Sequence, residues 1–141
     1  MKKRNNKIYN KKYKIKDKKK NKEIKINRVI KFKKKVISLD VKKVSKLGKY
    51  SGLMFRKKGS KNLLFEFESE FPTIHSIFVF FDFLAVWLDE NNEVQDYFVV
   101  KPFSLSARPK RPSAKLIEIP INSENKKIIE LFVGKRKDLN R

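Results

Sequence analysis

The sequence contains no cysteine and a single histidine, His75, among its 141 residues. A chain without cysteine forms no disulfide, iron–sulfur cluster, zinc ribbon or thiol nucleophile, and one histidine cannot build a multi-histidine metal site. Its four glycines are scattered too widely for a phosphate-binding loop. We therefore expect no cofactor, no metal and no catalytic residues, so the protein is expected not to be an enzyme.

Long apolar runs are also missing. The longest, residues 77–88, has 12 residues including Asp82, which is too short to cross a bilayer. The basic beginning of the chain is not followed by the apolar stretch and small-residue cleavage site of a secretory signal. These observations predict a cytoplasmic protein.

Acidic residues are scarce, with 15 Asp and Glu against 37 Lys and Arg, a net charge of +22. Residues 1–35 hold 18 basic and 2 acidic residues, a net charge of +16, and residues 36–141 hold the remaining +6. Because blocks of like charge repel one another, we expect residues 1–35 to be a disordered tail and residues 36–141 to be a single domain.

The lysines of the tail have two interpretations. As phosphate-binding groups they would release counterions from RNA, DNA or the ribosome, and the candidate contacts are Lys11, Lys12, Lys14, Lys18, Lys19, Lys20, Lys33, Lys34 and Lys35. However, Lys outnumbers Arg by 30 to 7, Ile and Asn are abundant and Ala is rare. The second interpretation is therefore that codon bias toward A and T alone enriched the lysines, because it produces the same residue preferences.

Beyond the tail, the hydrophobic pattern predicts an α+β domain. Alternation and apolar runs indicate strands at 36–41, 62–68, 94–101 and 115–120, and either two strands or one bent strand over 74–88 with its break near Asp82. The spacing of apolar residues predicts one or two short helices, over 42–51 and over 124–133, the second ended by Gly134. The expected sheet is small, curved and mainly antiparallel, or a partly open barrel, and its firmest hairpin runs from 86 to 100.

Five aromatic residues crowd the apolar segment between residues 78 and 87, namely Phe78, Phe80, Phe81, Phe83 and Trp87. One strand buries alternate residues on each face, so this density requires a sheet covered on both sides or an exposed apolar patch. Core packing is the simpler interpretation.

Several blocks in order resemble the family called domain of unknown function 192, also known as uncharacterised protein family 0127. They are Gly52-Leu-Met-Phe-Arg56, Leu64-Phe-Glu-Phe67, His75-Ser-Ile-Phe78, Val86-Trp-Leu-Asp89, Val100-Lys-Pro102, Leu116-Ile-Glu-Ile-Pro120 and Val133-Gly134. The resemblance extends over about residues 37–137 and is to archaeal members in its His-Ser-x-Phe segment. It implies a small β-rich α+β fold with no assigned activity or cofactor. The chain departs from the family at Asp82, Leu84 and Lys135, where the family has Pro, Asp and Asp.

The expected function is the binding of a small molecule or a partner protein in a groove around Met54, Arg56 and His75, with Asp82 and Asp89 as further candidates. His75 has the alternative of a hydrogen-bonded structural residue, and Arg56 that of a residue in a lysine-rich surface loop. The alternative function is polyanion binding by the Lys-rich tail.

Overall fold

The computed structural model describes residues 24–44, 53 and 56–135. Within these residues the chain forms one six-stranded mixed sheet and a single short helix. The strands are β1 (Ile24–Phe32), β2 (Lys35–Lys43), β3 (Leu63–Glu66), β4 (Phe83–Leu88), β5 (Val94–Val100) and β6 (Lys115–Pro120), and the helix is α2 (Lys126–Val133). Their order across the sheet is β1-β2-β3-β6-β4-β5, and β2 with β3 is the parallel pair among otherwise antiparallel neighbours.

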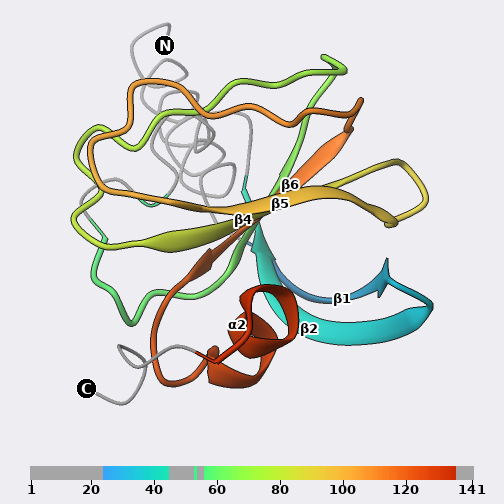
Figure 1. Cartoon of the computed structure of the whole chain (residues 1–141), viewed down its shortest axis with the longest axis horizontal. Coiled ribbons are helices and arrows are strands. Elements are labelled where there is room, and N and C mark those ends of the chain that lie inside the picture. Colours follow the sequence, from blue (N-terminus) through green and yellow to red (C-terminus); the bar gives the residue numbers. More distant parts are fainter. Residues whose placement is uncertain (1–23, 45–52, 54–55, 136–141) are drawn as a thin grey trace, which may run out of the picture.

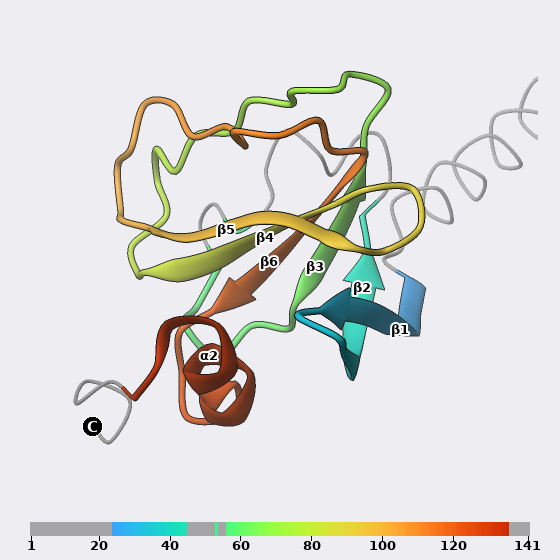
Figure 2. The same ribbon diagram turned by 45° about the vertical axis from the view of Figure 1, so that its right-hand side comes forward.

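The sheet is curled into a partly open half-barrel (Figure 1). Its first and last strands meet at one point, where the Lys31 N–H donates to the Asn92 carbonyl at 2.9 Å and Lys31 forms a bridge with Glu93. Figure 2 shows α2 on one side of the sheet and the long loops that precede β4 and follow β5 on the other. The strongly twisted β1–β2 hairpin therefore forms one wall of the half-barrel.

Two clusters of buried apolar side chains lie on the two faces of the sheet. On the helix side, Leu84 and Val86 of β4 pack with Ile129 and Phe132 of α2. On the loop side, Phe83 and Trp87 of the same strand pack under the loops. Every residue of β4 is buried, because both faces of this strand are covered. Its continuous apolar sequence is typical of a strand in that position.

The predicted α+β class with a curved sheet is confirmed, as are the hairpin that joins β4 to β5, the strand at 115–120 and the end of the second helix at Gly134. Gly134 has φ of 79°, the left-handed geometry that glycine adopts without strain. The strands expected at 36–41 and 62–68 are β2 and β3 with shifted ends. Most of the helix expected over 42–51 lies outside the described residues, and its first two residues belong to β2.

Two predictions were wrong in part. Residues 24–35 were assigned to the disordered tail, but they form β1, its turn and the first residue of β2, because apolar residues at alternate positions such as Ile26, Ile30 and Phe32 face the core. The strand expected over 74–88 is limited to β4. Residues 75–82 form irregular loop, and Ile74 pairs only in an isolated bridge with Ala107.

Candidate functional site

The structure places only some of the predicted site residues, and the groove expected around Met54, Arg56 and His75 stays a prediction. Met54 lies outside the described residues. Asp82 and Asp89 stand directly before and after β4, and a strand of this length holds its ends about 20 Å apart. Asp82 forms an ion pair with Lys101, and His75 lies exposed on the loop before it.

Asp89 is occupied by its own turn. Its Oδ1 accepts hydrogen bonds from the backbone N–H groups of Asn91 and Glu93, at 2.8 and 2.9 Å, and its Oδ2 accepts one from the Gln95 side chain at 3.1 Å. Side-chain bonds of this kind let aspartate fold the chain back on itself. Asp89 thus shapes the β4–β5 hairpin.

The residue next to His75, Ser76, is fully buried and joins the two loops on that side of the sheet. Its hydroxyl donates to the Lys101 carbonyl at 2.6 Å and accepts from the Ser104 N–H at 2.7 Å. Its backbone carbonyl accepts from the N–H groups of Val79 and Phe103. The His-Ser segment therefore has a structural role through its serine.

Ser76→Ala is expected to lower the free energy of unfolding by about 1 to 3 kcal/mol, because the Ser104 N–H loses its buried acceptor. Urea denaturation measures this change, and amide hydrogen exchange should become faster at Ser104. The matched control is Ser106→Ala, at an exposed position in the same loop, which is expected to stay within about 0.5 kcal/mol of the wild type. Equal stability of the two variants would contradict this role.

The five aromatic residues between 78 and 87 divide between core and surface. Phe81, Phe83 and Trp87 are buried, as predicted, whereas Phe78 and Phe80 are 46% and 60% exposed. Phe80 makes an edge contact with Phe103, which is also exposed. The loops on this side of the sheet consequently display apolar rings at the surface.

Glu118, which the sequence analysis did not single out, is a carboxylic acid inside the core. It lies on β6 between Leu63 of β3 and Ala85 of β4, on the loop side of the sheet, and is buried. Burial raises the pKa of the Glu118 carboxyl to about 8, against opposing effects from a hydrogen bond with the Leu53 backbone and from the positive charge of Arg56. Arg56 is therefore near enough to this buried carboxyl for its positive charge to favour the ionised form.

One oxygen of this carboxyl, Oε2, has no hydrogen-bond partner within the described part of the chain, and neither has the indole N–H of Trp87. Leu116 pairs with Trp87 in the register of β6 and β4, and Glu118 pairs with Ala85. The two polar groups are therefore on the same face of the sheet, two residues apart along the strands. The sequence contained a signal for this: in Leu116-Ile-Glu-Ile-Pro120 the residues on both faces of the strand are apolar except for Glu118. A carboxyl in a strand buried on both faces has to be buried as well.

Among the described residues, the strongest concentration of charge lies on the β1–β2 hairpin. Residues 24–43 hold eight basic residues and one acidic residue, a net charge of +7, whereas the other described residues hold 12 basic and 11 acidic residues, a net charge of +1. The 23 residues that precede β1 add 12 basic and two acidic residues. The basic surplus of the folded part therefore belongs to a single two-stranded ribbon at one edge of the sheet (Figure 1).

Three exposed lysines, Lys33, Lys34 and Lys35, occupy the turn of this hairpin and the start of β2. Lys33 and Lys34 have φ angles of 46° and 64°, in the left-handed region that costs about 1 to 2 kcal/mol for a residue with a side chain. The Lys33 ammonium lies 5.1 Å from the centre of the Phe32 ring. Of the predicted nucleic-acid contacts, these three are placed by the structure, and Lys11, Lys12, Lys14, Lys18, Lys19 and Lys20 lie outside the described residues.

No group of three or more His, Cys, Asp and Glu side chains in the described ranges is arranged to hold a metal ion. No helix formed by those residues is long and apolar enough to cross a bilayer.

Two solved structures share the fold. A protein of unknown function from Novosphingobium aromaticivorans DSM 12444 superposes with a TM-score of 0.59 at 12% identity, over 68% of this chain and 73% of the other. A proposed transcription regulator from Sinorhizobium meliloti 1021 superposes with the same TM-score at 18% identity, over 68% of this chain and 79% of the other. No family model and no curated protein matches the chain, so its membership in the family of domain of unknown function 192 stays a prediction.

Proposed function

We propose that this protein is a non-enzymatic binding domain that binds the phosphate backbone of nucleic acid through the β1–β2 hairpin and the basic segment before it, in the cytoplasm. The observation that carries the proposal is the net charge of +7 on residues 24–43, against +1 on the rest of the described chain. Lysines that neutralise phosphates release condensed counterions, which gives affinity independent of base sequence.

The geometry of the hairpin turn supports the same function. Two central residues with positive φ are what a type I′ turn requires, and Asn-Gly is the pair that fits it without strain. This chain has 11 asparagines, yet it places two lysines in that conformation. Strained residues that persist in a fold are concentrated at functional sites, and here the strain presents ammonium groups at an exposed tip.

A nucleic acid suits this surface better than a lipid membrane does. Membrane-surface elements pair their basic residues with Trp, Phe or Leu side chains that enter the lipid. The exposed apolar residues of the hairpin are only Val29 and Val36 among those whose side chains the structure describes. The similarity of fold to a proposed transcription regulator is in keeping with a nucleic-acid partner.

The test is the double variant Lys33→Asn with Lys34→Gly in the full chain. It restores the preferred turn, so the free energy of unfolding is expected to rise by about 1 to 2 kcal/mol. At the same time, the affinity for a duplex DNA or single-stranded RNA oligonucleotide is expected to fall, with the slope of log K against log salt smaller by about 1.4 to 1.8. Fluorescence anisotropy over a range of salt concentrations measures the affinity and its dependence on salt.

The matched control, Lys57→Gln with Lys58→Gln, removes two charges from an exposed loop elsewhere and is expected to leave the slope almost unchanged. A third variant, Lys18→Gln with Lys19→Gln and Lys20→Gln, measures the share of the preceding basic segment. Equal losses of affinity in the hairpin and control variants would show that net charge alone determines binding, which would contradict a specific role of the hairpin. Binding to anionic lipid vesicles with no binding to either oligonucleotide would refute the nucleic-acid partner.

A further inference from the structure

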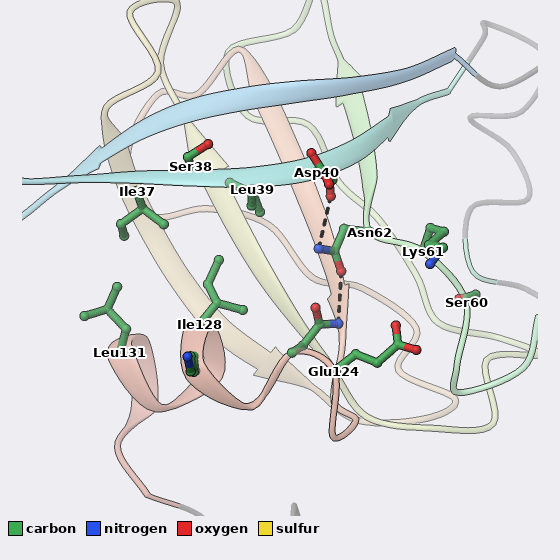
Figure 3. Close-up of a pocket in the computed structure, with 12 residues that line it drawn as sticks. Ile37, Ser38, Leu39, Asp40, Ser60, Lys61, Asn62, Glu124, Ile128 and Leu131 are labelled. Carbon is green, nitrogen blue, oxygen red and sulfur yellow. Dashed lines mark hydrogen bonds between the residues drawn. The ribbon is translucent and has the colours of Figure 1, made fainter.

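A cleft separates β2 from α2 on the helix side of the half-barrel (Figure 3). Its volume is about 420 Å³, within the range of sites that hold one small molecule. Residues from β2, from the segment before β3 and from α2 and its N-terminal approach line it. The cleft is thus built by elements that are far apart in the sequence.

The two ends of the cleft differ in chemistry. Figure 3 shows Ile37, Ile128 and Leu131 gathered at one end. Asp40, Asn62, Glu124, Lys61 and Ser60 lie toward the other end. A ligand that fills the cleft therefore needs a compact apolar part and a polar head.

A chain of amide hydrogen bonds fixes the polar end. The Asn62 side chain donates to the Asp40 carbonyl at 3.3 Å, and the Asn125 side chain donates both to the Asn62 side-chain oxygen at 3.0 Å and to the Pro120 carbonyl at 2.8 Å. The Asn125 N–H in turn donates to the Asn122 side chain. These bonds tie β2, the end of β6 and the start of α2 together, so the polar groups are held in place before a ligand binds.

The cleft contains charged groups of both signs. Its lining contains the carboxylate of Glu124 and two ammonium groups, Lys61 and Lys127. The Asp40 carboxyl lies on the opposite face of β2 from Ile37 and Leu39, where its Oδ1 accepts a hydrogen bond from the Asn27 side chain at 3.1 Å. Glu124, Lys61 and Lys127 make no side-chain hydrogen bond or ion pair within the described part of the chain. The Ser60 hydroxyl is buried in the lining without a partner among the same residues. The presence of a carboxylate and of ammonium groups in one cleft favours a zwitterion over a ligand that carries charge of a single sign.

We propose that this cleft binds a free α-amino acid with a branched apolar side chain. The ammonium group of the ligand is placed against the carboxylate of Glu124, and its carboxylate against Lys61, as charge-assisted hydrogen bonds. The side chain then covers Ile37, Ile128 and Leu131. The proposal is independent of nucleic-acid binding, because the cleft faces α2 and does not include the hairpin turn.

The probe is L-leucine, titrated into the full chain and followed by the NMR amide shifts of Asn62 and Ile128 and by isothermal titration calorimetry. Leucine is expected to give saturable shifts at both positions. Glycine, which lacks the side chain, and 4-methylpentanoate, which lacks the ammonium group, are each expected to bind at least about tenfold more weakly. Equal affinity for leucine and 4-methylpentanoate would overturn the assignment of a zwitterion.

Two charge variants test the head group. Glu124→Gln and Lys61→Met are each expected to weaken leucine binding about tenfold, and both positions are exposed, so the fold should be kept. The controls Glu90→Gln and Lys110→Met make the same changes at exposed positions outside the cleft and are expected to bind as the wild type does. Absence of saturable shifts, or equal binding by cleft and control variants, would refute the site.

Discussion

Glu118→Gln is expected to abolish most of the dependence of stability on pH between about pH 4.5 and pH 8. In the folded protein, burial raises the pKa of the Glu118 carboxyl from 4.5 to about 8, whereas in the unfolded chain it is free to ionise at its ordinary pKa. Between these two values the unfolded chain releases a proton that the folded chain keeps. The stabilisation of the folded state is therefore complete below about pH 4.5 and is lost as the pH rises through about 8.

The size of this effect follows from the pKa shift. Each unit of difference corresponds to 1.36 kcal/mol, so the wild type should lose roughly 3 to 5 kcal/mol relative to the Gln variant between about pH 4 and about pH 9. The amide stays neutral in both states and has nearly the shape of the protonated acid. Guanidinium denaturation at both pH values measures the change.

Glu90→Gln provides the control for Glu118→Gln, since Glu90 is an exposed carboxylate on the turn after β4. Its pH profile is expected to run parallel to that of the wild type. If Glu118→Gln also ran parallel, the carboxyl of Glu118 would have to ionise normally in the fold, in contradiction with its burial. Arg56 is not expected to become more exposed at high pH, because the ionised Glu118 carboxylate attracts its guanidinium more strongly than the neutral acid does.

The sequence predicted the local elements of the fold better than the contacts between distant ones. The β4–β5 hairpin, β6 and α2 are marked by apolar patterns and by turn or cap residues such as Asp89 and Gly134. By contrast, β6 lies between β3 and β4, and β1 closes on Asn92. Such pairings depend on which faces fit together in three dimensions, and a single sequence carries no local signal for them.

The candidate sites show the same limit. Sixteen of the first 35 residues are lysine, and the repulsion expected among them outweighs the alternation of Ile26, Ile30 and Phe32 in a reading of the sequence alone, which therefore places β1 in the tail. The cleft between β2 and α2 depends on a meeting of residues about 85 positions apart, such as Asp40 and Asn125. The burial of Glu118 was predictable from its strand alone, because the other residues on both faces of that strand are apolar.

Phe32→Ala is expected to lower the free energy of unfolding by about 3 to 5 kcal/mol and to weaken nucleic-acid binding without removing any charge. The Phe32 ring stacks on Phe132 of α2, with centroids 4.5 Å apart, and meets Tyr97 of β5 edge-on at 5.1 Å. It is the last residue of β1, directly before the lysines of the turn. Removing the ring takes away the packing that holds the hairpin tip against both the helix and the far edge of the sheet.

The measurements are chemical denaturation and the salt dependence of oligonucleotide binding. Since no charge is lost, the slope of log K against log salt is expected to stay within about 0.5 of the wild type while the affinity falls at every salt concentration. This pattern differs from that of the turn variant Lys33→Asn with Lys34→Gly, which changes the slope. If Phe32→Ala proves too unstable to study, Phe32→Leu keeps most of the volume and is expected to lower stability by roughly 1 to 2 kcal/mol with the same pattern.

Val29→Ala is the control for Phe32→Ala, because Val29 lies on the same strand but is 46% exposed. Its change in stability is expected to be within about 0.5 kcal/mol, and its binding should match the wild type. A Phe32 variant that is less stable yet binds nucleic acid with unchanged affinity would show that the lysines act as a flexible cluster whose position does not matter. A loss of affinity at constant slope instead requires that the fold hold the turn in place, because the charges are then the same and only their arrangement differs.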